Sequence, residues 1–162
     1  LMNGVGNEKF APEDSMTRAM LVTVLWREAG KPDAGKTAFT DVPANEWYTG
    51  AVAWAADCGV VNGVGGGKFD PDGAITREQM AAILFRYANT NQIDTAQRGD
   101  MAAFPDAGEV SDWAKDALSW SVAMGIIGGT EENGKVYLDP QGNATRAQVA
   151  TILMRFIQNV TE

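Results

Sequence analysis

Apolar residues recur at helical spacing in three stretches of the chain, each directly after a Thr-Arg pair at residues 17–18, 76–77 or 145–146. In the middle stretch the apolar positions are Met80, Ile83, Leu84 and Tyr87. This spacing is typical of one buried helical face. Each Thr stands where an N-cap belongs, and Gln79 and Gln148 would complete capping boxes in the second and third copies. The pattern predicts three amphipathic helices that each begin at an arginine.

A second kind of helix is predicted between these three. An extended Phe-x-Asp segment at Phe39 or Phe104 leads into a Trp-containing helix, whose apolar positions in one copy are Trp47, Ala51, Trp54, Ala55 and Cys58. A glycine-rich loop follows at 59–67 or 125–134. Gly-rich segments between periodic stretches are typically loops or turns. A very short strand is expected directly after the loop, at 68–69 or 136–138.

The two kinds of helix form a unit that repeats along the chain, since Thr17, Thr76 and Thr145 are 59 and 69 residues apart. Residues 39–88 and 104–158 are predicted to be full repeats, and residues 1–30 the second half of a first repeat. About twenty residues of that first repeat are expected to lie upstream, and a repeat buries its apolar face only against its neighbours. The missing helix therefore predicts an exposed patch, with self-association or partial disorder near residues 1–15.

Charge and composition exclude several classes of function. The net charge of −8 and pI near 4.5 argue against nucleic-acid binding, which needs a basic surface, and against docking on an anionic membrane. No apolar run is long enough for a transmembrane helix. The absence of histidine excludes His-based catalytic triads and the usual zinc sites. The single cysteine, Cys58, leaves no internal disulfide and is expected to be a small buried side chain.

Two further kinds of site do not fit the sequence. The stretch 70–75 echoes a calcium-binding EF-hand loop, but Lys68 and Gln79 would then stand at its first and last ligand positions, where oxygen donors including a Glu are needed. A glycosidase needs two carboxylates across a cleft, and no pair is singled out by the sequence. We therefore expect no metal site, no cofactor and no catalytic residue in this segment.

The three arginines at the helix starts are the candidate ligand-binding residues. A cation at the first helical position opposes the helix macrodipole by ~0.3–1 kcal/mol, and a local rule broken in every copy is typical of a functional site. A helix N-terminus with free N–H groups favours an anion, and a guanidinium adds a forked donor suited to a carboxylate. The alternative is a salt bridge between repeats, to Asp41 or Asp106. The candidates are Arg18, Arg77 and Arg146.

These motifs together resemble the S-layer homology (SLH) repeat. The resemblance rests on Phe-x-Asp-Val at 39–42, the Trp-containing helix, Gly-Val-Val-Asn-Gly at 59–63, Phe-x-Pro at 69–71 and Ile-Thr-Arg-Glu at 75–78. It implies a mainly α module of three repeats, arranged with pseudo-threefold symmetry around a central helical bundle with at most very short strands. It also implies a secreted bacterial cell-surface protein anchored without covalent bonds to a secondary cell-wall polysaccharide, often carrying ketal-linked pyruvate.

By the same resemblance, the ligand binds in grooves between neighbouring repeats and contacts the three arginines. The family's Asp corresponds to Asp41 and Asp106, and its Trp to Trp47 and Trp113. The residues themselves leave alternatives open: the aspartates could cap the turn into the Trp helix, and the tryptophans could be core. Gly63 and Gly129 are expected to permit unusual backbone angles, although their amides could reach a ligand. Trp54 and Trp120 are expected in the core, and the arginines near helix C-termini are expected to be structural: Arg27, Arg86 and Arg155.

The function expected from the sequence is non-catalytic cell-wall anchoring. One alternative is a structural or self-assembly module of a surface-layer protein that binds no glycan. A catalytic domain elsewhere in a full-length protein is compatible with either hypothesis.

Overall fold

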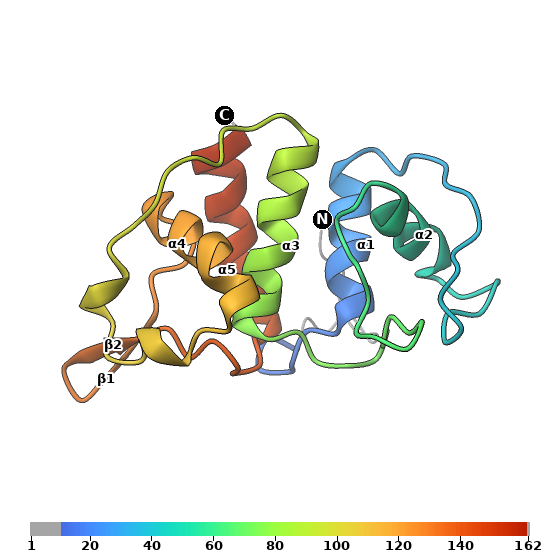
Figure 1. Cartoon of the computed structure of the whole chain (residues 1–162). Helices are drawn as coiled ribbons and strands as arrows, with labels where there is room; N and C mark the ends of the chain where they lie inside the picture. The colour runs from blue at the N-terminus through green and yellow to red at the C-terminus, as the bar shows by residue number, and fades with distance from the viewer. Residues whose placement is uncertain (1–10, 162) are drawn as a thin grey trace.

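The computed structural model describes residues 11–161 of the chain, which form five α-helices (Figure 1). Three of them begin at the predicted arginines: α1 (Arg18–Glu28), α3 (Arg77–Thr90) and α5 (Arg146–Phe156). The other two are α2 (Thr49–Asp57) and α4 (Lys115–Ala123). Two short antiparallel strands, β1 (Thr130–Glu132) and β2 (Lys135–Tyr137), form a hairpin. Short 3-10 turns span Met101–Ala103, Ala107–Glu109 and Asp112–Ala114, and a π turn spans Ile157–Thr161.

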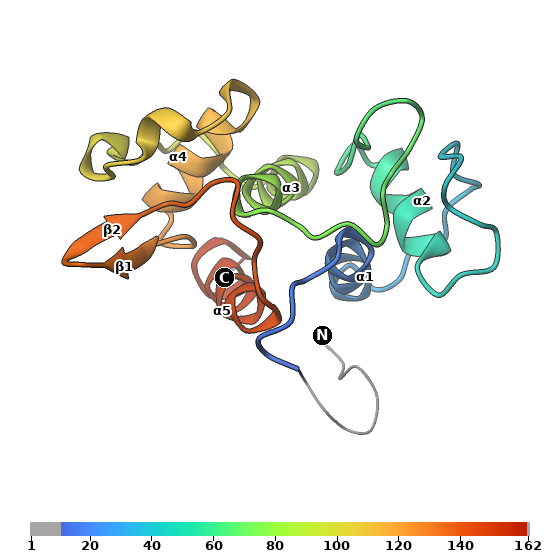
Figure 2. The same cartoon turned by 90° about the horizontal axis from the view of Figure 1, so that it is seen from below.

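The three helices that begin at arginine stand together in the middle of the molecule. Seen from below, α1, α3 and α5 surround a common axis, while α2 lies outside α1 and α4 lies outside α3 (Figure 2). The core lies between these elements and includes the fully buried Leu21, Ile75, Leu84, Trp120 and Phe156. The predicted mainly helical fold with a central bundle is therefore confirmed.

The helix starts were predicted correctly because their capping groups are local. Thr17, Thr76 and Thr145 are the N-caps, and each side chain accepts a hydrogen bond from the backbone N–H three residues later. In α3 and α5 the Gln79 and Gln148 side chains complete the capping boxes. In α1 the corresponding residue is Met20, which has no such acceptor.

A closed ring of three backbone hydrogen bonds joins the segments that precede the central helices. The N–H of Ile75 donates to the carbonyl of Met16 at 2.8 Å, that of Ala144 to Ile75 at 3.0 Å, and that of Met16 to Ala144 at 2.9 Å. Each segment therefore donates to one neighbour and accepts from the other. The ring gives the bundle its pseudo-threefold symmetry.

The helix N-termini carry no free N–H groups at their first two positions, which corrects the expectation that they do. In α3 the N–H groups of Arg77 and Glu78 donate to the carbonyls of Gly142 and Pro140. The first two N–H groups of α1 donate likewise to Gly73 and Pro71, and those of α5 to residues 14 and 12. The acceptors lie in a turn of the neighbouring repeat, which local sequence could not indicate. An anion bound here must be held by side chains.

Some smaller predictions from the sequence are confirmed and others are not. The predicted short strand in the third repeat is present as β2. Its partner β1 lies within the segment predicted as a glycine-rich loop at 125–134, and residues 133–134 form the turn between the two strands. Cys58 is only partly buried, at the edge of the core. Residues 1–10, which are most of the segment at 1–15 where the exposed patch was predicted, lie outside the described residues. Within the described part of the chain, no helix has both the length and the apolarity to cross a membrane.

Candidate functional site

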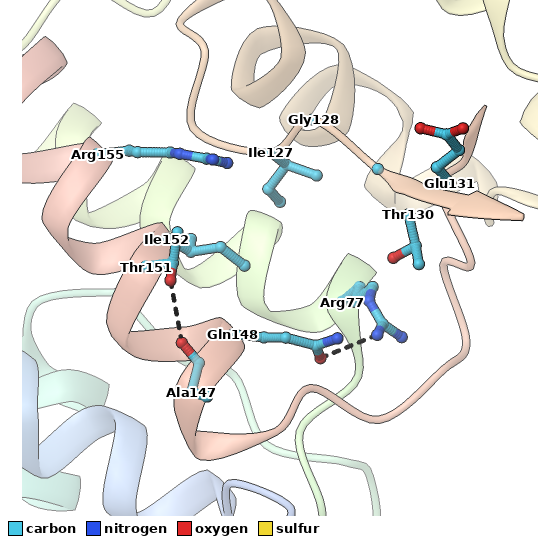
Figure 3. A pocket seen from close by; sticks show the side chains of 11 residues that line it. Arg77, Ile127, Gly128, Thr130, Glu131, Ala147, Gln148, Thr151, Ile152 and Arg155 are labelled. Atoms are coloured by element: carbon cyan, nitrogen blue, oxygen red, sulfur yellow. Dashed lines mark hydrogen bonds between the residues drawn. The ribbon is translucent and has the colours of Figure 1, made fainter. Parts of the chain in front are cut away.

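Two grooves lie beside the central helices, and each is built where one repeat meets the next. The first groove, of about 330 Å³, is lined by α1, the loop at 61–64, α3 and Trp113. The second groove, of about 440 Å³, is lined by the start of α3, the loop at 127–131 and α5 (Figure 3).

The two grooves use equivalent positions of successive repeats. Arg18 in the first groove corresponds to Arg77 in the second, and each comes from the helix start of the preceding repeat. The rest of each groove comes from the following repeat, through its glycine loop and the helix after it. The equivalent pairs from that repeat are Gly63 and Gly129, Gln79 and Gln148, Ile83 and Ile152, and Arg86 and Arg155.

Gly63 and Gly129 line the first and the second groove, respectively. Both have a φ of +80°, a left-handed conformation that favours glycine. A Cβ at Gly63 would lie 2.5 Å from the carbonyl oxygen of Lys68 and 2.7 Å from the ring of Phe39. At Gly129 it would lie 2.8 Å from the carbonyl oxygen of Tyr137. The predicted unusual backbone angles are confirmed, and close packing of the loop adds a second need for glycine.

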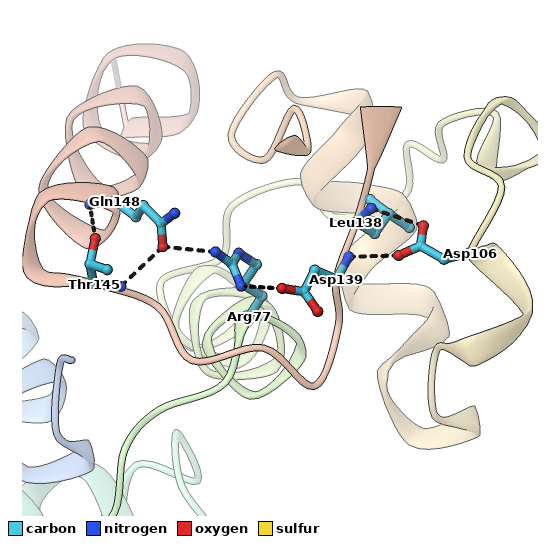
Figure 4. A network of polar contacts seen from close by, with 6 residues as sticks. All are labelled: Arg77, Asp106, Leu138, Asp139, Thr145 and Gln148. Atoms are coloured by element: carbon cyan, nitrogen blue, oxygen red, sulfur yellow. Dashed lines mark hydrogen bonds and ion pairs between the residues drawn. The ribbon is translucent and has the colours of Figure 1, made fainter. Parts of the chain in front are cut away.

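Arg77 is held in place by polar partners from the third repeat (Figure 4). One Nη donates to the Asp139 carboxylate at 3.0 Å, and the other donates to the Gln148 side-chain oxygen at 2.9 Å. The same Gln148 oxygen accepts from the backbone N–H of Thr145. The predicted inter-repeat salt bridge therefore exists at Arg77, but its acid is Asp139 and not Asp41 or Asp106.

Arg18 is in a different environment, although its position is equivalent. It is 6% exposed, its Nε donates to the carbonyl of Phe69 at 2.8 Å, and its guanidinium lies 5.0 Å from the centre of the Phe69 ring. Its two Nη groups have no hydrogen-bond acceptor among the residues that the structure describes. Burial lowers the pKa of Arg18, the nearby Asp70 raises it, and the Arg86 guanidinium lowers it further.

Arg146 is the third member of the set and is 4% exposed. One of its Nη groups lies 3.3 Å from the sulfur of Met20, which occupies the position of Gln79 and Gln148. A third groove beside it would involve the loop of the first repeat, at residues 3–4, which lies outside the described residues. A ligand role for Arg146 stays a prediction.

Asp41 and Asp106 bind the backbone of their own repeats. The two carboxylate oxygens of Asp41 accept from the N–H groups of Phe69 and Asp70 at 2.9 and 2.8 Å. Those of Asp106 accept from Leu138 and Asp139 at 2.9 and 2.8 Å. They do not cap the turn into the Trp helix, as one alternative had it. Neither aspartate is among the residues that line the two described grooves, and their role as ligand-binding residues stays a prediction.

Trp47 and Trp113 are each 56% exposed, so the alternative that they are core residues is wrong. The reason is that α2 and α4 begin later than predicted, at Thr49 and Lys115, which leaves both tryptophans before the helix. Trp113 lines the first groove, to which it comes from the third repeat. Trp54 and Trp120 are buried, as predicted.

Two residues of the grooves were missed as candidates. Arg86 and Arg155 were expected to be structural, but Arg86 lines the first groove and Arg155 the second. The signal that could have found them is their spacing, because each lies seven residues after the groove-lining Gln79 or Gln148 and so shares its helical face. No group of three acidic or cysteine side chains suited to a metal ion occurs in the described chain.

Comparison with known proteins agrees with this architecture. The family model of the S-layer homology domain matches residues 38–81 and 103–150. The chain is 34% identical over 160 residues to a surface-layer 125 kDa protein of Lysinibacillus sphaericus, which covers 99% of this chain and 13% of that protein. It is 30% identical to an amylopullulanase of Thermoanaerobacterium thermosulfurigenes, over 98% of this chain and 8% of the enzyme.

A third relative is the S-layer protein sap of Bacillus anthracis, 32% identical over 93% of this chain and 18% of that protein. The chain therefore spans only a small part of the curated relatives it matches. Among solved structures, an undecaheme cytochrome from the S-layer of Carboxydothermus ferrireducens aligns with a TM-score of 0.47 and 21% identity, over 84% of this chain and 20% of that chain.

Proposed function

This chain belongs to the S-layer homology domain family, and from that membership we propose that it anchors a cell-surface protein by binding an anionic polysaccharide of the bacterial cell wall. The proposal is supported by the kinds of protein that share the sequence. They include surface-layer proteins, and also an amylopullulanase of which only 8% is covered. One module joined to such different proteins suits a shared attachment function, with any catalysis carried by other parts of the full-length chain.

The observation that carries the proposal is the pair of equivalent grooves, each with two arginines. A carboxylate-bearing sugar, such as one with ketal-linked pyruvate, can accept the forked N–H groups of a guanidinium. Arg18 and Arg77 are the proposed carboxylate-binding residues, with Arg146 in the same role at the third interface. The amides of the Gly63 and Gly129 loops would contact the sugar, and the exposed indoles of Trp47 and Trp113 would stack on it.

Several grooves on one module would strengthen attachment to a polymer. Once one sugar is bound, the next groove meets its ligand at a high effective concentration, which raises the overall affinity without any new contact. Weak single sites would then suffice for stable anchoring.

The alternative is a self-assembly module that binds no glycan. It is favoured by one observation, that Arg77 already has an acidic and an amide partner within the protein. On this hypothesis the arginines would join repeats and the surface would join other copies of the chain.

Co-sedimentation with purified cell-wall polysaccharide tests the proposal. The wild-type protein is expected to sediment with untreated polymer, and much less with polymer from which mild acid has removed the pyruvate. The double variant Arg18→Gln with Arg77→Gln is expected to lose binding while keeping its helical circular dichroism spectrum. Binding that persists after pyruvate removal would contradict a carboxylate ligand. Loss of folding in the double variant would favour the self-assembly hypothesis.

A further inference from the structure

We propose that the first groove is the high-affinity site for an acidic sugar, that Arg86 is a ligand-binding residue in it, and that the second groove is weakened by the protein's own carboxylates. This inference rests on the proposed function and goes beyond it, because it distinguishes two grooves that the repeat makes formally equivalent.

Two cations converge on the first groove, and neither forms a hydrogen bond or ion pair with a carboxylate of the described chain, although Asp70 and Asp41 lie near enough to raise the pKa of Arg18. Arg18 is 94% removed from solvent, yet its Nη groups have no acceptor among the described residues. Arg86 lines the same groove and forms no hydrogen bond or ion pair with the described part of the chain. Burial lowers the pKa of Arg86, and Arg86 in turn lowers that of Arg18. Two partly desolvated like charges repel each other, and an anion bound between them would relieve that cost.

The second groove offers the same two positions, but one of them, Arg77, has partners within the protein. Arg77 already donates to Asp139 and Gln148, and Glu131 lines the groove itself. In the first groove the residue equivalent to Glu131 is Gly65, and no carboxylate is among the lining residues. An anionic ligand would therefore have to displace Asp139 and approach Glu131 in the second groove. In the first groove Asp70, the residue equivalent to Asp139, forms no hydrogen bond or ion pair with Arg18.

The first groove is also the one completed by an exposed indole. Trp113 lines it, and the position of that segment is fixed by Glu78 at the start of α3. The Glu78 carboxylate is 4% exposed and accepts from the backbone N–H of Ser111 at 3.0 Å and from its hydroxyl at 2.8 Å. Ser111 precedes Trp113 by two residues, so this contact holds the indole over the groove. The first groove thus combines Arg18, Arg86 and Trp113 from three successive repeats.

The ligand that fits this combination is a sugar ring with one acidic substituent. The indole offers a flat apolar surface for the ring, and the two guanidiniums offer N–H donors to the acidic group. A neutral sugar would leave both cations unpaired, so the site should select strongly for the charged form.

The test is a titration of the whole 162-residue protein with a hexose that carries a ketal-linked pyruvate, and with the same sugar without pyruvate. Calorimetry gives the affinity, and the indole N–H signals in NMR spectra, with that of Trp113 assigned from Trp113→Phe, show which groove is occupied. The matched variants are Arg86→Gln and Arg155→Gln, which change equivalent positions of the two grooves. Arg86→Lys keeps the charge and is a second variant at that position.

We expect the Trp113 indole signal to move with the pyruvylated sugar. Arg86→Gln should weaken binding by about tenfold or more, as the loss of a charge-assisted contact does. Arg155→Gln should weaken it by about twofold or less, because Arg77 is already paired with Asp139 and Glu131 lines the second groove, so that groove contributes little to binding. Arg86→Lys should fall between Arg86→Gln and the wild type. A larger loss with Arg155→Gln than with Arg86→Gln would overturn the assignment of grooves while leaving the proposed function intact. A wild-type protein that binds neither sugar would overturn both.

Discussion

At the scale of single residues, the carboxylates of Asp41 and Asp106 show how a conspicuous acid can serve the backbone. Each uses both oxygens to accept N–H groups from the turn that leads toward the next central helix. That turn also supplies the carbonyls that receive the first N–H groups of the neighbouring helix. An aspartate in this place therefore supports the interface between repeats without being part of an ion pair.

Removing the charge from Asp106 should destabilise the protein measurably. Asp106 is 9% exposed and accepts two backbone hydrogen bonds, and bonds to a charged acceptor contribute about 1.5–3 kcal/mol each. Asp106→Asn keeps one amide oxygen, so we expect a loss of about 2–3 kcal/mol in the free energy of unfolding by urea. Asp139→Asn should cost only about 1 kcal/mol, because the Asp139 carboxylate is exposed to water although its partner Arg77 is mostly buried. Equal losses would contradict this account.

The contribution of Asp41 should depend on pH. Burial raises the pKa of Asp41, but the hydrogen bonds from Phe69 and Asp70 lower it by more, and the folded pKa lies below the ordinary value. The carboxylate therefore stabilises the fold above the unfolded pKa of about 3.9, and that stability is lost as pH falls through the folded pKa. The difference in unfolding free energy between wild type and Asp41→Asn should be full at neutral pH and shrink in acid. A constant difference would refute the assignment.

Gly63 provides a second test at this scale. Gly63→Ala places a Cβ against a backbone carbonyl and the Phe39 ring in a left-handed conformation, so we expect a loss of about 2 kcal/mol or more. Gly66 has a φ of +62° but open space around it, so Gly66→Ala should cost only about 1 kcal/mol for the backbone conformation. Thermal unfolding of the two variants separates the effect of packing from that of the dihedral angle.

At the scale of elements, α3 has a contact that α1 and α5 lack. Its second residue, Glu78, is buried and binds Ser111, whereas the equivalent residues of α1 and α5 are Ala19 and Ala147. This contact ties the start of α3 to the segment that precedes α4. The carboxylate also lies in the first turn of its helix, where negative charge suits the macrodipole.

Glu78→Gln should loosen that segment without unfolding α3. The variant keeps the side-chain length but loses the charged acceptor of two hydrogen bonds, one from the N–H and one from the hydroxyl of Ser111. We expect the free energy of unfolding to fall by about 1–3 kcal/mol. Faster amide exchange at residues 111–114, with unchanged exchange in the middle of α3, is the expected result. A matched control is Gln141→Ala, which removes a single exposed hydrogen bond to the carbonyl of Glu109. Equal effects of both variants would count against a special role for Glu78.

The elements were predicted from the sequence where local chemistry decides them. The Thr caps and the helical spacing after them located α1, α3 and α5, because capping groups lie within a few residues of the helix start. The starts of α2 and α4 were missed, since Tyr48 and Ala114 have no side-chain cap and no local signal separates Trp47 or Trp113 from the helix. Grooves between repeats that contain the helix-start arginines followed from the resemblance alone. Their other lining residues, such as Arg86 and Arg155, were not identified, because each groove combines residues from repeats far apart in the sequence.

At the scale of the whole molecule, the pseudo-threefold arrangement followed from the resemblance to a known repeat, whereas the ring that closes it did not. The backbone hydrogen bonds between Met16, Ile75 and Ala144 join three different repeats, and no spacing in the sequence specifies them. The sequence likewise does not predict the difference between the two grooves, because that difference depends on Asp139 forming an ion pair with Arg77 while Arg18 forms none with a described residue.

The ring should make the central helices unfold together. The amides of Met16, Ile75 and Ala144 are donors in one closed set, so opening one removes support from the next. We expect these three amides to exchange with solvent at a common rate that reports global unfolding. Native-state hydrogen exchange measures this directly, with the exposed hairpin amide of Val136 as a fast control. Faster exchange at Met16 alone would show that α1 separates from the other two.

A ring also fixes how many units it can hold. In an open solenoid the last unit presents the same face as the first, so copies can be added at either end. Here the hydrogen bond from Met16 to Ala144 uses the donor and the acceptor that a fourth helix would need. A fourth unit therefore cannot join this ring, and a longer array needs a second, separate trio. The number of grooves between repeats in one trio is limited to its three interfaces.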